Sequence, residues 1–177
     1  MQSNQKDDFA LFLFGLLATD VNYSAFIEQS ITKLADLHGY ADSSFLEIDP
    51  NQNIAFFRAA SGSNATHLKK FIIPKGEGII WQALNGRLPI EVNNASDNAA
   101  HLKQISESLN YTVNDLLVVP VQLRGRVFGA VELLNCQKRS AETLEQVRKS
   151  SGYFDKALEV MLLFNGYRAR FEQKDAA

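Results

Sequence analysis

The sequence predicts an α+β fold, a sheet covered by helices, from three observations. Residues 73–80 (IPKGEGII) describe a strand that stops at a proline and enters a helix through a glycine-bracketed turn. Residues 116–135 hold two apolar runs joined across an Arg-Gly-Arg turn, the pattern of a β-hairpin. Apolar residues at helical spacing occupy both ends of the chain. This arrangement suits holding a small molecule or a partner protein.

Length and charge limit the class of protein. The 177 residues are enough for one domain whose core needs neither a metal nor a disulfide. A net charge of -2 supplies no bulk attraction to nucleic acid or to an acidic membrane surface. The single cysteine, Cys136, excludes an internal disulfide and agrees with a cytoplasmic location. We therefore expect a cytoplasmic protein with neither nucleic acid nor membrane as a partner.

The first predicted element is a helix over residues 5–18. Its apolar run is about half of the ~20 residues that span a bilayer. The preceding Lys6, Asp7 and Asp8 are net acidic, and no small-residue cleavage site follows, so a signal peptide is the weaker interpretation. The helix is apolar on every face, which predicts contacts on more than one side.

A second helix and three strands follow. Asp20 or Asn22 is placed to cap the helix, and Gly39 is placed to end it. Alternating or continuous apolar residues bounded by turn residues mark the strands. The predicted strands are residues 44–48, 54–60 and 67–73.

The second half of the chain continues with a short helix that Gly86 ends. The remaining predicted elements are a helix over 79–84, a strand over 88–92, a helix over 102–109, strands over 115–123 and 126–135, and a last helix over 141–174. At 1.5 Å per residue the last helix is about 50 Å long, whereas a domain of this size is about 40 Å across. The last helix therefore extends beyond its own domain.

The terminal helices predict a homodimer. Exposed apolar side chains on them would cost about 1.5–3 kcal/mol each in water, which a second copy of the chain would relieve. The side chains in question are Phe9, Phe12, Leu16, Phe164 and Phe171.

These motifs, in this order, resemble the GAF domain. The matching segments are residues 44–46, 59–62, 73–79, 88–90, 117, 119–121, 125–129 and 131–135. The resemblance covers about residues 23–169. It implies a single domain over residues 1–177, whose core spans about residues 23–140. It implies an antiparallel sheet of about six strands, GAF/PAS-like, with both terminal helices on one face and short helices and loops walling a pocket on the other. It also implies a sensor of a small molecule, such as a cyclic nucleotide, or a dimerisation module, with a separate signalling protein as a partner.

The family's known chemistries find little support in this sequence. The cyclic-nucleotide signature Asn-Lys-Phe-Asp-Glu begins at Asn135, but Cys136 stands in the place of the lysine. Bilin attachment requires a cysteine beside a histidine, and sulfoxide reduction requires several cysteines. No metal-ligand spacing joins the three histidines, and the Gly76–Gly78 turn lacks the lysine and serine of a phosphate loop. We therefore expect no catalytic residue, no metal site and no enzymatic activity, and the residues specify no cofactor.

A ligand pocket is expected under a roof formed by residues 93–111. Its candidate polar contacts are Arg58, Asn94, Ser96, Asp97 and His101, and its candidate walls are Phe57, Trp81 and Tyr111. Each has a structural alternative: Arg58 facing water, Asp97 capping a helix, Trp81 in the core. A lone loop histidine such as His101 is more typical of a solvated residue than of a haem ligand.

Three functions stay open on the sequence. The first is a non-enzymatic, homodimeric sensory GAF protein in which a ligand shifts the terminal helices. The second is a structural interaction module, in which the protein's own aromatic side chains fill the pocket. The third is redox chemistry at Cys136.

Overall fold

The structure is a computed structural model that describes residues 5–62, 65–93, 95, 107–138, 140 and 142–175. Side chains are described for residues 8–166 of these ranges. The elements are α1 (Gln5–Leu17), α2 (Tyr23–His38), β1 (Tyr40–Asp49), β2 (Ile54–Ala60), α3 (Ala65–Leu68), β3 (Ile72–Pro74), α4 (Gly78–Gly86), β4 (Ile90–Asn93), β5 (Asp115–Leu123), β6 (Arg126–Cys136) and α7 (Thr143–Asp175). The predicted helix over 102–109 lies largely outside the described residues.

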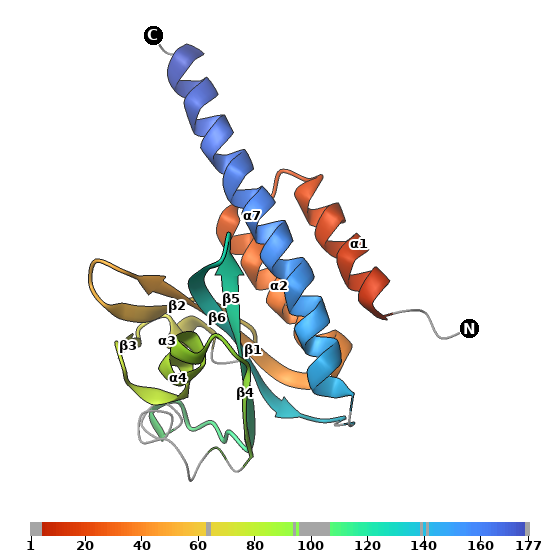
Figure 1. Cartoon of the computed structure of the whole chain (residues 1–177), viewed down its shortest axis with the longest axis vertical. Helices are drawn as coiled ribbons and strands as arrows, with labels where there is room; N and C mark the ends of the chain where they lie inside the picture. Colours follow the sequence, from red (N-terminus) through yellow and green to blue (C-terminus); the bar gives the residue numbers. More distant parts are fainter. Residues whose placement is uncertain are drawn as a thin grey trace.

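The six strands form one antiparallel sheet in the order β3-β2-β1-β6-β5-β4. Helices α1, α2 and α7 lie on one side of the sheet, and α3 and α4 lie on the other (Figure 1). The predicted α+β fold, with terminal helices on one face and short helices on the other, is confirmed. Side chains of successive strand residues point to opposite faces, so the sheet separates two cores.

The core on the helical side contains three aromatic rings in contact. Phe154 of α7 stacks on Phe26 of α2 with ring centroids 6.4 Å apart, and it forms a T-shaped pair with Phe45 of β1 with centroids 5.9 Å apart. All three side chains are fully buried. Helix α2 reaches this core because Asn22 caps its first turn, accepting a hydrogen bond from the Ala25 amide at 2.9 Å. Of the two predicted caps, Asn22 is the N-cap residue of α2.

One predicted strand is wrong. Residues 67–73 were expected to be extended, whereas residues 65–68 form α3 and only Ile72–Pro74 pair with β2 as β3. Leu68 and Phe71 are three residues apart, and both pack against the core on the α4 side. A helical turn brings residues at this spacing to the same side, which an extended strand does not.

The terminal helices hide more of their own apolar surface than the sequence suggested. Phe9 and Leu16 were expected to need a second copy, but α2 and α7 help to bury them, with exposed fractions of 0% and 9%. Phe12 is half-buried under Lys33, whose ammonium lies 5.8 Å from the ring centroid. Phe164 is exposed as expected, with an exposed fraction of 60%. The Phe171 side chain lies outside the described side chains.

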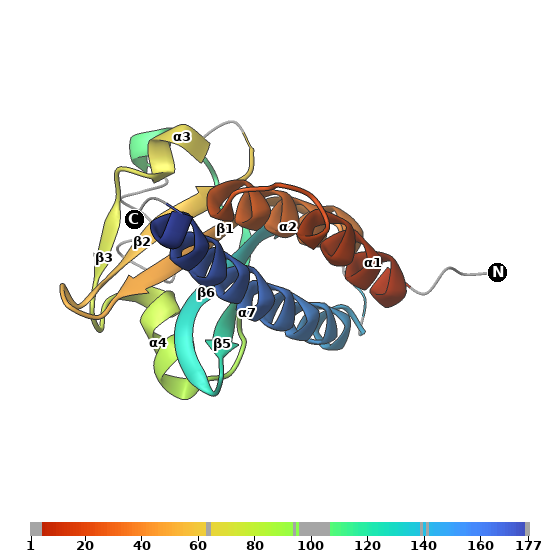
Figure 2. The ribbon, with the colours of Figure 1, turned by 90° about the horizontal axis from the view of Figure 1, so that it is seen from above.

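Helix α7 has 33 residues, hence a length of about 50 Å at 1.5 Å per residue. Its C-terminal part projects past the sheet, and α1 runs beside its N-terminal part in both views (Figures 1 and 2). The prediction that α7 outruns the domain is confirmed. Among the helices that the structure describes, none combines the length and the apolar character required to cross a bilayer.

Candidate functional site

Three of the predicted pocket residues share the sheet face opposite the terminal helices. Phe57 and Trp81 belong to the core on this face, with exposed fractions of 6% and 5%, and Tyr111 packs against its edge. The Trp81 indole N–H donates to the carbonyl oxygen of Ile73 at 3.3 Å, which fixes the ring between α4 and β3. The structure therefore brings these aromatic side chains to one surface of the sheet.

Arg58 lies on the other face. Its Nε donates to Glu47 Oε2 at 2.7 Å, and its guanidinium lies over the rings of Tyr23 and Phe56 at 5.7 and 4.8 Å. Tyr23 begins α2, so this cluster faces the helical layer. The hydrogen bond that Arg58 donates to Glu47 raises the Arg58 pKa, and burial together with Glu47 raises the pKa of Tyr23. The structure does not bring Arg58 to the surface that holds Trp81.

The four other predicted contacts, Asn94, Ser96, Asp97 and His101, lie outside the described residues. Cys136 is partly exposed at the end of β6, and its amide donates to Asp115 Oδ1 at 2.9 Å. Across the ranges that the structure describes, no three histidine, cysteine or acidic side chains are grouped in a way that could hold a metal ion.

Sequence reasoning missed a buried acid on the same surface, Glu132 of β6. Its neighbours Val131 and Leu133 enter the helical core, so the Glu132 side chain points to the opposite face, where 4% of the residue is exposed. Ser44 of β1 lies directly across from it, and the Ser44 hydroxyl donates to Glu132 Oε2 at 2.7 Å. Burial raises the pKa of the Glu132 carboxyl to about 7, against the lowering effect of Ser44. A lone charged residue inside the apolar run of residues 130–134 was the available signal, because charged side chains are rarely buried without a partner.

A hydrogen-bond network at one end of this surface ties the segment after residue 106 to the sheet. The Tyr111 hydroxyl donates to Asp42 of β1 and accepts from Asn135 Nδ2 at 3.0 Å. The Asn135 side chain also donates to the Thr112 carbonyl at 2.9 Å and accepts from the Asn114 amide at 2.7 Å. Burial and the bond to Asp42 raise the Tyr111 pKa. Tyr111, predicted as an apolar wall, therefore acts through its hydroxyl as well.

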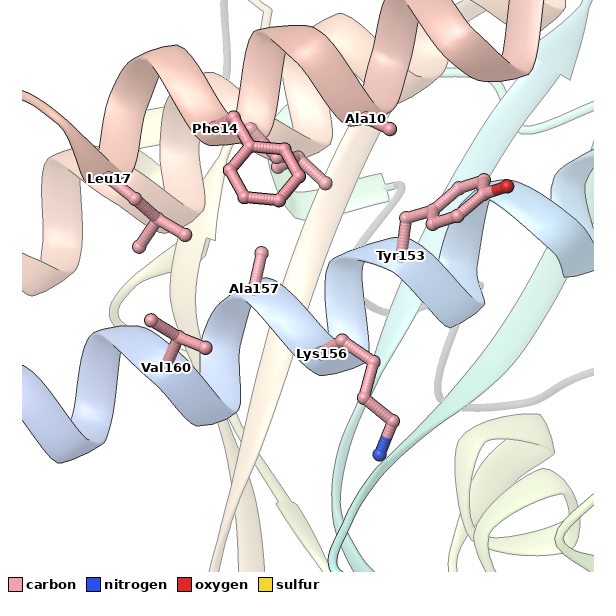
Figure 3. Close-up of a pocket in the computed structure, with 8 residues that line it drawn as sticks. Ala10, Phe14, Leu17, Tyr153, Lys156, Ala157 and Val160 are labelled. Carbon is pink, nitrogen blue, oxygen red and sulfur yellow. The ribbon is translucent and has the colours of Figure 1, made fainter.

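The opposite face carries an apolar groove of about 230 Å³ between α1 and α7 (Figure 3). Phe14 and Leu17 of α1 face Ala157 and Val160 of α7 across it, while the Lys156 ammonium points away from α1. Phe14 is 70% exposed and Val160 is 38% exposed. The groove is a second surface, lined by apolar side chains and partly open to solvent.

Two carboxylates of α7 hold the tip of the β5–β6 hairpin. Asp155 Oδ2 accepts from the Gln122 amide at 3.2 Å, and Glu159 Oε1 accepts from the Arg124 amide at 2.7 Å. Burial raises the pKa of Asp155 to about 7, and the bond from Arg124 lowers the pKa of Glu159. The hairpin that carries Glu132 on one face is thus bonded to α7 on the other.

Comparison with solved structures finds the same fold in proteins of different activity. The GAF domain of a phosphoenolpyruvate-protein phosphotransferase from Coxiella burnetii superposes with a TM-score of 0.72 at 15% identity, covering 97% of this chain and 99% of that one. The phycoerythrobilin-bound GAF domain of a cyanobacterial phytochrome gives 0.70 at 10% identity, covering 91% and 98%. No curated protein sequence matches this chain.

A third similar structure corrects one prediction. The free methionine-R-sulfoxide reductase of Neisseria meningitidis, in complex with its substrate, superposes with a TM-score of 0.68 at 18% identity, covering 89% of this chain and 90% of that one. The prediction that the chain is not an enzyme is overturned by this finding, because the fold it adopts also serves a reductase. A GAF domain profile matches residues 12–152, more than half of the chain. The chain therefore belongs to the GAF domain family.

Proposed function

We propose that this GAF domain binds a small molecule on the sheet face that carries Glu132 and Trp81, and that it forms a homodimer through α1 and α7. The observation that carries the proposal is the buried Ser44–Glu132 pair in an otherwise apolar layer. A buried polar group of this kind is costly for the fold alone, and binding sites place few polar groups among apolar walls. The binding of bilin by similar GAF domains supports a small-molecule role for this fold.

The β5–β6 hairpin provides the physical link between the two surfaces. Glu132 faces the ligand side, while Asp155 and Glu159 of α7 hold the hairpin tip from the other side. A ligand that moves β6 shifts the register or angle of α7 relative to the second copy. The output passes to a separate signalling protein through the part of α7 that projects beyond the sheet (Figure 1).

Native mass spectrometry with an absorbance scan tests the ligand. The expected result is a native mass above the sum of the polypeptides present, each of 19.7 kDa, with an excess that is lost on denaturation. A native mass equal to two polypeptides without any excess, in protein purified without dialysis, favours a module that only dimerises. That second candidate has its own support in the exposed apolar groove between α1 and α7.

Light scattering tests the dimer, with Phe14→Glu as the disrupting variant. Phe14 is 70% exposed in a single chain, so a charge there leaves the monomer fold intact but blocks the groove. We expect the native chain at twice 19.7 kDa and the variant at 19.7 kDa. Leu88→Glu is the matched control, because Leu88 is 61% exposed and follows α4, away from the groove. A native monomer at micromolar concentration contradicts the proposal.

A further inference from the structure

We propose that Glu132 and Ser44 anchor the ligand, and that this ligand carries a protonated amine on a small apolar body. The inference rests on the proposed function, since it names the chemical class bound at that site. It starts from the immediate surroundings of the Glu132 carboxylate. Ala130, Val118 and Leu46 lie on the same face and belong to the same apolar core, so the carboxylate has little water around it.

Among the residues that the structure describes, one neutral donor compensates this carboxylate. In the part of the chain that the structure describes, Ser44 is the one side chain that bonds Glu132, through Oε2. No described lysine or arginine pairs with it. A carboxylate with one neutral donor is under-compensated at this depth, because a buried charge requires a counter-charge or several hydrogen bonds.

A second carboxylate increases the negative charge of the site. Asp42 lies two residues before Ser44 on β1, opposite Leu134, which makes Asp42 a diagonal neighbour of Glu132 at about 7–8 Å between backbones. Asp42 accepts from the Tyr111 hydroxyl, which is neutral, and no described cation pairs with it. The two acids therefore favour a cationic group and repel a phosphate or a carboxylate.

The remainder of the surface is apolar and aromatic. Leu46 is the cross-strand partner of Phe57, and Trp81 belongs to the same core. A ligand that reaches Glu132 with an ammonium group meets these walls with its carbon body. An amine with a compact apolar or aromatic body fits both requirements, whereas a nucleotide fits neither the charge nor the polarity.

The first test needs no ligand. The side-chain carboxyl of Glu132 is followed by carbon-detected NMR across a pH titration of the free protein and is assigned through Glu132→Gln. A carboxyl without a counter-charge titrates near pH 7, well above the ordinary glutamate pKa of 4.5. Titration at or below 4.5 shows that a cation of the chain already pairs with Glu132, which overturns the proposal.

The second test compares probes that share one phenyl ring. Phenethylamine, phenethyl alcohol and hydrocinnamate present an ammonium, a hydroxyl and a carboxylate on nearly the same body. We expect phenethylamine to move the Trp81 indole and Glu132 carboxyl signals and to bind at least about tenfold more tightly than the other two. Glu132→Gln removes this preference, and Glu145→Gln, on the exposed face of α7, leaves it unchanged.

The outcomes separate this inference from the proposed function. Equal binding by the three probes, or a preference that survives Glu132→Gln, overturns the amine assignment and leaves a ligand site on this face. Absence of phenethylamine binding also overturns the amine assignment. Two results together contradict the proposed function itself. Purified protein carries no small molecule, and a ligand identified later changes the signals of residues in the α1–α7 groove instead of those of Trp81.

Discussion

Replacing the Glu132 carboxyl by an amide is expected to stabilise the free protein above neutral pH. Glutamine retains an oxygen that accepts the Ser44 hydroxyl, and it removes the negative charge from the apolar layer. Burial raises the folded-state pKa of Glu132 from 4.5 to about 7, so the folded state holds the proton more tightly than the unfolded chain. The penalty for ionising Glu132 is absent below pH 4.5, grows between 4.5 and 7, and is complete above 7.

The size of the penalty follows from the same two pKa values. At 1.36 kcal/mol per pKa unit, the interval from 4.5 to about 7 corresponds to roughly 3 kcal/mol of unfolding free energy. At pH 5 most of this penalty is absent, because the folded carboxyl is still protonated. The gain in stability from Glu132→Gln is therefore expected to be about 2–3 kcal/mol larger at pH 8 than at pH 5.

Urea denaturation followed by the fluorescence of Trp81, the single tryptophan, measures this difference. The native chain, Glu132→Gln and Glu145→Gln are compared at pH 5 and pH 8. Asp155 also has a raised pKa, so its ionisation lowers the unfolding free energy of all three proteins as the pH rises. Comparing the three proteins at the same pH cancels this contribution. Equal gains at the two pH values, with far-UV circular dichroism unchanged, refute the reasoning.

Two further variants test the packing of the sheet and the network at its edge. Gly129→Ala is expected to destabilise the fold by about 1–3 kcal/mol or more in urea denaturation, because its Cβ would overlap the Leu46 carbonyl oxygen between two paired strands. Gly152→Ala, with open space around its Cβ on α7, is the control and should be neutral or stabilising. Tyr111→Phe is expected to cost about 1–3 kcal/mol, because Asp42 loses the donor that bonds it, and an unchanged urea midpoint contradicts that bond.

Local chemistry made several elements predictable from the sequence. Asn22 carries a side-chain acceptor at the right place to cap α2, and Gly39 takes the left-handed conformation that ends it, with φ at 73°. The β5–β6 hairpin follows from its apolar runs and from Gly125 in its turn, with φ at 75°. Each of these signals acts over a few residues, so a single segment contains the whole cause.

The candidate site was only partly predictable because its parts come from distant segments. Phe57 and Trp81 were identified as walls from their aromatic character, and the structure brings them to one face. Glu132 was missed because its significance depends on Ser44, which lies 88 residues earlier in the chain and becomes its cross-strand neighbour through pairing of β1 with β6. Nothing near Glu132 in the sequence names that partner.

The sequence by itself determined the capped helix and the hairpin, because those depend on the conformational preferences of neighbouring residues. The tertiary structure alone decided which face each strand residue occupies. Ala59 illustrates the reason: the register between β1 and β2 shifts beside Phe45 and Leu46, and Arg58 is the extra residue in this β-bulge. Alternation from Phe57 places Arg58 on the helical face beside Glu47, and the bulge places the next residue, Ala59, in the helical core as well. Strand pairing fixes such a shift, and the sequence of one strand does not contain it.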